Sequence, residues 1–365
     1  MALSNFRKET SERSDPHNWA KAMLARLTDF FFEAIEGCSQ SNANVVTHLM
    51  ERARVTVDDR PKSAPQEVLQ ALVELEAPDA LDRKIRFARH FNLPLSYVLY
   101  SNEREKVYLL EIPSLIDIKH VRTFNSFKAF ADWLASIKGW VSTKPYRESA
   151  DLPYFDQELR KYGTAWPTNI DCFFTDEQHK PLGMIEFQNA RDTGVMQHCN
   201  NDHFLCKNVR QVQGASGVQL KYSDDIRRWT SQEILRVQSG LRLFIVTWAQ
   251  HEPGFVLKEL EKVTMPYFPE QKGKPKWQEA DAYKARLHSY VKQNKPVSIE
   301  QDICVNYSTV SFSFCDGKMN KTIHQPPLNP LNKTFPSLYY YFKKKVTNDR
   351  QQLPALLSAL CSNQA

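Results

Sequence analysis

Two acids and one amide lie on segments whose composition predicts neighbouring β-strands. Asp171 lies within residues 170–175, and Glu186 and Gln188 lie within residues 182–189. If residues 176–181 form a symmetric hairpin loop, residues whose numbers sum to 357 lie opposite each other, so Asp171 faces Glu186 with Cβ atoms about 5 Å apart. Side chains two apart share a strand face, so Gln188 projects on the same side as Glu186. The three polar groups are therefore expected to converge.

Two carboxylates this close repel each other unless a cation neutralises them. Mg²⁺ binds one or two carboxylates together with water and phosphate oxygens, and Mn²⁺ is expected to substitute for it. Such an ion activates water and stabilises charge on a phosphoryl group. The alternative is that Asp171 and Glu186 are ordinary acids on a solvated strand face, paired with Lys180, Arg191 or Lys161, or that the register slips by one residue.

The elements around this hairpin follow a defined order. Residues 155–162 are predicted to form a short helix that ends at Gly163. Residues 224–239 form a second predicted helix, ending at Gly240, and residues 243–249 form an apolar strand. The predicted order is helix, hairpin, helix, strand.

In this order, residues 168–171 (Thr-Asn-Ile-Asp) and 183–189 (Gly-Met-Ile-Glu-Phe-Gln-Asn) resemble the motif of the PD-(D/E)xK nuclease superfamily, in an E-x-Q variant. The resemblance covers about a quarter of the chain. It implies a restriction-endonuclease-like core, an α/β (α+β) fold with a mixed central sheet flanked by helices. It also implies that Asp171 and Glu186 bind metal and that Gln188 stands where most members have lysine.

The glutamine is a departure from the family pattern. A lysine would help to hold the attacking water, whereas a neutral amide can only orient it by hydrogen bonding. A second cation, or Lys207, Lys221 or Arg227 from the following segment, could compensate. Glu158 matches a place where some members supply a further acid, and Asp156 competes with it. For both, the alternative is a solvated helical acid.

The flanks of this core are expected to differ from it. Residues 1–115 are predicted to be a mainly helical region, with helices at 18–36, 65–75 and 78–91, that ends in a strand pair at 95–100 and 106–112. A helix at 125–138 opens the nuclease-like core, placed at residues 116–260. Residues 261–365 are expected to form a basic, aromatic extension of mixed structure.

Composition favours a globular protein of the cytoplasm. Of 365 residues, 42% are hydrophobic, the polar start lacks a signal-peptide core, and no run reaches the roughly 18 apolar residues of a membrane span. The seven cysteines include no CxxC pair, which favours reduced thiols. His198, Cys199, His203 and Cys206 could bind zinc, but they lack a second ligand pair elsewhere, so a polar loop is the preferred interpretation.

The net charge of +6 is matched by seven basic residues against one acid in residues 318–350. Within that stretch, Tyr340, Lys343, Lys344 and Lys345 combine stacking surface with phosphate-binding charge, although a core strand with a solvated basic end fits equally well. We therefore expect a Mg²⁺-dependent phosphodiesterase, most simply a DNA endonuclease of the restriction, phage-defence or recombination type. The alternative is a nucleic-acid-binding protein that has lost turnover. DNA is the expected partner, a homodimer is one assembly to test, and no membrane is expected.

Overall fold

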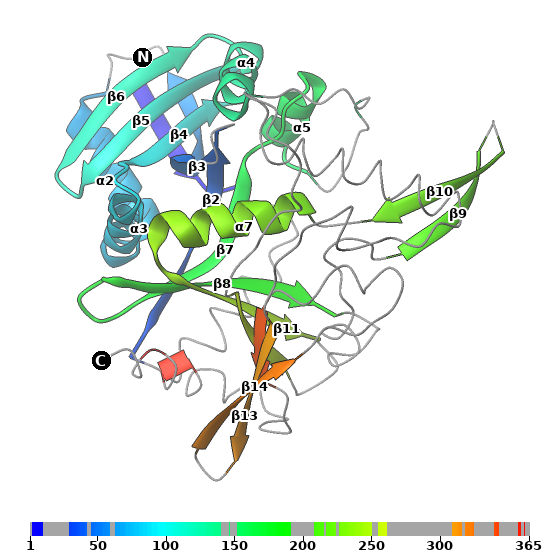
Figure 1. Cartoon of the computed structure of the whole chain (residues 1–365). Helices are drawn as coiled ribbons and strands as arrows, with labels where there is room; N and C mark the ends of the chain where they lie inside the picture. The colour runs from blue at the N-terminus through cyan, green and yellow to red at the C-terminus, as the bar shows by residue number, and fades with distance from the viewer. Residues whose placement is uncertain are drawn as a thin grey trace. The chain divides into compact units, whose positions relative to one another are not determined.

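The computed structural model describes residues 2–9, 29–41, 45–58, 63–139, 146, 152–190, 208–214, 217–223, 226–249, 255–260, 309–315, 318–324, 339–342, 357–358 and 361 (Figure 1). The chain divides into two compact units. Unit 1 comprises Met1–Ser41, Val45–Ile185 and Leu357–Ala365, and unit 2 comprises Asn42–Asn44 and Glu186–Leu356. The division falls inside one strand, and each unit is described by itself.

Unit 1 is an α+β structure built on a mixed sheet. Its strands are β1 (Ala2–Arg7), β2 (Phe31–Gln40), β3 (Val46–Asp58), β4 (Leu95–Ser101), β5 (Lys106–Ser114), β6 (Asp117–Phe124), β7 (Thr168–Thr175) and the first part of β8 (Pro181–Asn189). The order across the sheet is β8-β7-β2-β3-β4-β5-β6, and β1 also pairs with β3. The β3–β4 pair is parallel, while β2–β3 and β7–β8 are antiparallel.

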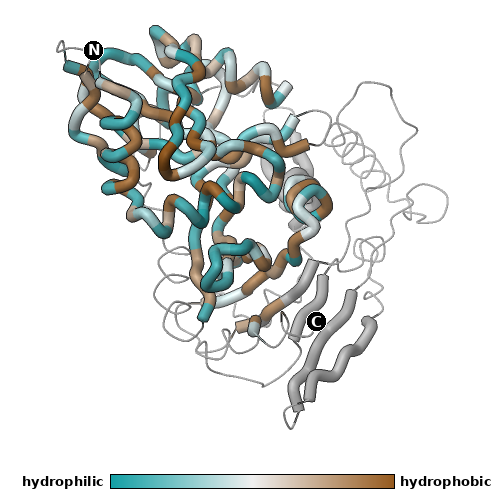
Figure 2. The backbone as a smooth tube through the Cα atoms, turned by 90° about the vertical axis from the view of Figure 1, so that its left-hand side faces the viewer, coloured by the Kyte–Doolittle hydropathy of each residue, from teal (hydrophilic) through white to brown (hydrophobic). Residues whose placement is uncertain are grey.

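Helices flank this sheet. α2 (Pro65–Glu76) and α3 (Pro78–His90) each begin at a proline, α4 (Phe127–Lys138) begins after Ser126, and α5 (Tyr154–Lys161) follows Pro153. On β4, Tyr97 reaches Glu76 of α2, whereas Val98 belongs to the apolar core formed with α4 and α5. Because successive strand residues point to opposite faces, these helices cover both faces of the sheet. Figure 2 shows apolar and polar residues mixed along the described chain.

The apolar core beside α4 is mainly aromatic. Phe155 of α5 stacks on Tyr100 of β4, with ring centroids 4.1 Å apart, and its ring also meets Phe127 and Phe130 of α4. Such rings bury a large area each and prefer offset or edge-to-face contacts. This packing fixes α5, and with it the two acids of that helix, against the sheet.

Several expected elements are confirmed and one is wrong. The predicted helices at 65–75, 78–91, 125–138 and 155–162 and the strands at 95–100, 106–112, 170–175 and 182–189 are present within a few residues of their expected ends. The expected helix at 18–36 is wrong over residues 31–36, which lie in β2, and residues 18–28 lie outside the described part. Among the described residues of the first ninety, the strands β1, β2 and β3 accompany the helices α2 and α3.

Unit 2 contains the end of β8, α7 (Ile226–Ser239) and β11 (Arg242–Trp248), as expected for the helix and strand after the hairpin. β12 (Phe255–Leu260), β15 (Tyr339–Phe342), β13 (Thr309–Cys315) and β14 (Lys318–His324) follow β11 in strand order, and β9 (Asn208–Gly214) pairs with β10 (Gly217–Ser223). In the described part of the chain, no helix is both long and apolar enough to cross a membrane.

Candidate functional site

The hairpin of β7 and β8 has the register expected from the sequence. Cys172 pairs with Ile185, Phe173 with Met184 and Phe174 with Gly183, so each pair sums to 357. The register shifts only beside the turn, where Thr175 pairs with Pro181. In the turn, the Asp176 carboxylate accepts hydrogen bonds from the backbone N–H groups of Gln178 and Lys180, at 3.0 and 2.8 Å. These bonds fix the turn and therefore the register.

The apolar side chains on one face of the hairpin are buried. Ile170, Cys172, Phe174, Ile185 and Phe187 are all buried. Phe173, on the strand face that Asp171 shares, is also buried, and its ring stacks on Phe87 of α3 with centroids 4.1 Å apart. The strands are therefore packed on both faces near the turn, which holds their polar ends in defined positions.

Asp171 directly precedes Cys172 in unit 1 and is half-buried. The side-chain amide of Asn169, two residues earlier on the same strand face, donates a hydrogen bond of 2.8 Å to Asp171 Oδ1. A neutral donor on one oxygen orients a carboxylate without cancelling its charge.

Glu186 directly follows Ile185, in unit 2, and is buried. Gln232 of α7, also buried, donates from Nε2 to Glu186 Oε2 at 2.6 Å. Gln232 is a residue of the site that sequence reasoning misses. Its position on the helix indicates a buried residue, because Gln232, Leu235 and Ser239 recur at helical spacing on the buried face of α7. A long polar side chain on that face needs a hydrogen-bond partner.

Gln188 is half-buried, two residues beyond Glu186 on β8. Thr247 of β11, which is fully buried, lies with Oγ1 3.5 Å from Gln188 Oε1. Because this long hydrogen bond uses the amide oxygen, the two N–H donors of Gln188 are the groups with which it could bind a phosphate oxygen.

The two acids of α5 are buried rather than solvated. Asp156 accepts two hydrogen bonds from the guanidinium of Arg52, at 2.6 and 3.0 Å, and Glu158 forms an ion pair with Lys161. The hydrogen bond to Glu158 raises the pKa of Lys161. The bidentate Arg52–Asp156 pair fixes α5 to β3, so of the two acids Asp156 has the clear structural role. Glu158 stays a predicted further acid.

Several predicted residues lie outside what the structure describes. His198, Cys199, His203, Cys206 and Lys207 are not described, and neither are Lys343, Lys344 and Lys345. Lys221 lies in β10, Arg227 in α7 and Tyr340 in β15, where Tyr340 is the backbone partner of Glu259, but their side chains are not described.

The residues of the hairpin fit a Mg²⁺ ion in donor chemistry. Both acids provide hard carboxylate oxygens, and an amide hydrogen bond orients each of them, as is common for metal-binding carboxylates. Among the described residues no group of three or more His, Cys, Asp or Glu is arranged to hold a metal. Mg²⁺ is commonly bound through only one or two carboxylates, with water and substrate completing its shell.

A scan against protein-family models, a search of curated proteins and a search of solved structures each gave no match to this chain.

Proposed function

We propose that the chain is a Mg²⁺-dependent nuclease that hydrolyses phosphodiester bonds in DNA, acting in the cytoplasm. The observation that carries the proposal is the β7–β8 register. Asp171 and Glu186 occupy the next positions after the Cys172–Ile185 pair, one on each strand. The observed ladder ends at Cys172–Ile185, and the register predicted from the sequence would pair these two acids next.

The residues would divide the work as follows. Asp171 and Glu186 would hold Mg²⁺, which when bound supplies an activated water and stabilises charge on the phosphate. Asn169 and Gln232 would orient the two carboxylates. Gln188 would donate hydrogen bonds from Nε2 to a phosphate oxygen or to the water. The neutral amide of Gln188 would position its hydrogen-bond partner but would add no positive charge. We therefore expect slower turnover than at a site that contains lysine.

An activity assay tests this function. The purified chain is incubated with duplex, single-stranded and branched DNA and with RNA, in Mg²⁺, in Mn²⁺ or in EDTA. Cleavage is expected in either metal and not in EDTA. The nearly isosteric changes Asp171→Asn and Glu186→Gln should each reduce cleavage to background, because both keep the side-chain volume and remove the charge. Glu177→Gln, an exposed change in the turn of the same hairpin, should leave cleavage unaltered.

A variant of Gln232 tests the orientation of the Glu186 carboxylate separately from its binding to the metal. Gln232→Leu removes the donor to Glu186 but leaves both acids, so the metal concentration for half-maximal cleavage should rise by roughly 10- to 100-fold. DNA binding without cleavage in either metal would instead favour a binding protein that has lost turnover. Cleavage that survives both acid substitutions would rule out this site.

A further inference from the structure

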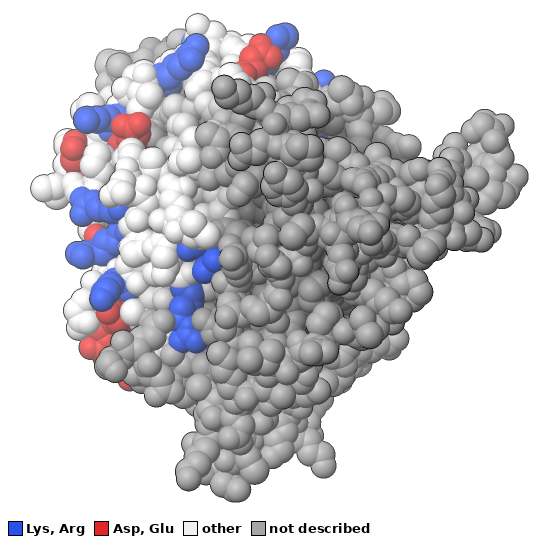
Figure 3. Space-filling view, viewed as in Figure 1, with Lys and Arg blue, Asp and Glu red and all other residues white. Residues whose placement is uncertain are grey.

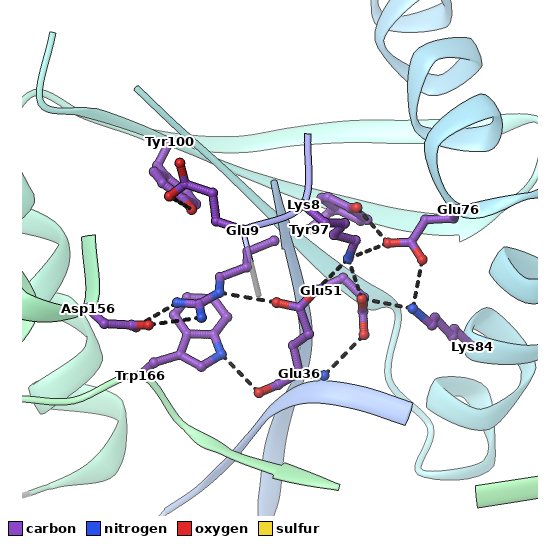
Figure 4. A network of polar contacts seen from close by, with 11 residues as sticks. Lys8, Glu9, Glu36, Glu51, Glu76, Lys84, Tyr97, Tyr100, Asp156 and Trp166 are labelled. Atoms are coloured by element: carbon purple, nitrogen blue, oxygen red, sulfur yellow. Dashed lines mark hydrogen bonds and ion pairs between the residues drawn. The ribbon is translucent and has the colours of Figure 1, made fainter. Parts of the chain in front are cut away.

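A second polar site lies wholly within unit 1, where β3 changes its pairing partner. β2 pairs with β3 up to Met50, and β1 pairs with it from Arg54 onward. Residues 51–53 lie between these two ladders, and the two residues after β1, Lys8 and Glu9, lie beside them (Figure 4). We call residues 2–9 the strap.

The strap places an ammonium group among three carboxylates. Lys8 Nζ donates to Glu36 Oε1 at 2.7 Å and to Glu51 Oε2 at 2.6 Å, and it also forms an ion pair with Glu76. The ring centroid of Tyr97 lies 5.2 Å from the same nitrogen. An ammonium has three N–H donors and no acceptor, so three acceptors and one aromatic face match its chemistry. We call Glu36, Glu51, Glu76 and Tyr97 the cage.

Contacts that do not involve Lys8 hold the cage in place. Glu51 Oε1 accepts from the backbone N–H of Glu36 at 3.1 Å, and Glu51 Oε2 accepts from Lys84 Nζ at 2.9 Å. Glu76 accepts from the hydroxyl of Tyr97 and from Lys84, both at 2.7 Å. These groups come from β2, β3, β4, α2 and α3, so the cage should keep its shape when the Lys8 side chain is removed.

The cage suits an ammonium better than a metal ion. The distances of 2.6 and 2.7 Å are those of charge-assisted N–H···O bonds, whereas Mg²⁺ would need oxygens near 2.1 Å. Glu51 is fully buried, and 23% of the Lys8 side-chain surface is exposed. Burial alone would lower the pKa of Lys8, but the charges of Glu51, Glu36 and Glu76 outweigh it and raise that pKa.

We propose that the cage is a binding site for a primary alkylammonium group, of which the chain's own Lys8 is the occupant. A ligand of this class, such as a small amine or a lysine side chain, competes with the strap for the same three carboxylates. Glu9 anchors the end of the strap separately, because its carboxylate accepts from Arg54 and from the Tyr100 hydroxyl, both at 2.9 Å. The site is independent of the proposed nuclease chemistry.

The proposal is tested by removing the end of the Lys8 side chain and supplying the same atoms as a small amine. Lys8→Ala removes three carbons and the nitrogen beyond Cβ, which is the heavy-atom skeleton of n-propylammonium. Thermal unfolding of the full chain is followed while n-propylammonium chloride is added. The melting midpoint of Lys8→Ala should fall below that of the wild type and rise saturably with the amine. Neither 1-propanol, which lacks the charge, nor tetramethylammonium, which lacks N–H donors, should produce this rise.

Two controls keep the outcome decisive. Arg7→Ala changes an exposed cation of the same strap and leaves Lys8 in the cage, so the amine should raise its melting midpoint far less than that of Lys8→Ala, as in the wild type. If Lys8→Ala does not fold, lysine reactivity is measured on the wild type by reductive methylation and mass spectrometry. Lys8 should then react far more slowly than the exposed Lys128. An equal amine response in Arg7→Ala, no response in folded Lys8→Ala, or equal labelling of Lys8 and Lys128 would overturn the proposal.

Discussion

At the scale of single residues, His48 is a group whose titration should affect stability. His48 lies on β3, its ring meets Trp133 edge to face at 5.3 Å, and within the described residues its Nδ1 is buried without a hydrogen-bond partner. Burial lowers the pKa of His48 in the folded protein. The unfolded chain therefore takes up a proton at a higher pH than the folded chain does.

The sign of the pH effect follows from this difference. The contribution of neutral His48 is fully present above the unfolded pKa of about 6.5 and is lost as the pH falls toward the lower folded value. We predict that the urea midpoint of the wild type falls more between pH 8 and pH 5 than that of His48→Phe, which keeps an aromatic ring beside Trp133. Comparing the two proteins cancels the titration of all other groups. Parallel curves would contradict the prediction.

The candidate site shows how far residue types alone can lead. The prediction that the numbers of paired residues sum to 357 followed from one assumption, that residues 176–181 form a symmetric loop. Three residue pairs confirm this register. The burial of Asp156 and Glu158 could not be predicted, because acids on a short polar helix are usually solvated. The partner of Asp156 is Arg52, 104 residues away, and no local pattern indicates a contact at that separation.

At the scale of elements, α4 has a defined start whose contribution can be measured. The hydroxyl of Ser126 accepts from the backbone N–H of Ala129 at 3.1 Å, and Gly139 ends the helix in the left-handed conformation, at φ 70°. Ser126→Ala should lower the free energy of unfolding by about 0.5 to 2 kcal/mol, measured by urea denaturation. Ser136→Ala, an exposed serine of the same helix, should change it by less than about 0.5 kcal/mol. Equal losses in the two variants would exclude the capping explanation.

Elements were predictable where their pattern was regular. The helices α2 to α5 of unit 1, which begin at a proline or directly after a proline or a serine, were predicted because start signals and apolar spacing agree in them. β2 was mistaken for part of a helix. Register shifts at Glu33–Ile35 and Ile35–Cys38 interrupt its alternation, so its apolar spacing imitates a helical one. β3 was not predicted because two of its residues, Glu51 and Arg52, are charged. Charged residues are rarely buried, but both are buried here in a central strand.

At the scale of the whole molecule, composition predicted a globular protein and the family resemblance implied a mixed fold, but neither predicted the division into two units. The boundary between the units falls between Ile185 and Glu186, inside β8, with no proline- or glycine-rich linker to mark it. On the described part of the face in Figure 3, basic and acidic side chains mostly lie near one another, so the small net charge does not identify a binding surface there.

Metal binding at the proposed site should be visible in the stability of the whole chain, because a ligand that binds only the folded state stabilises it. At a Mg²⁺ concentration about tenfold above its dissociation constant, the gain is roughly 1.4 kcal/mol. For a chain of this size that corresponds to a rise in the melting midpoint on the order of 2 °C. We predict this rise on changing from EDTA to Mg²⁺ in the wild type and in Glu177→Gln, and its loss in Asp171→Asn and Glu186→Gln. Sodium chloride at matched ionic strength controls for screening, which also acts on exposed pairs such as Lys128–Asp132. An undiminished rise in the Asp171→Asn, Glu186→Gln double variant would mean that the ion binds elsewhere, whatever the outcome of the cleavage assay.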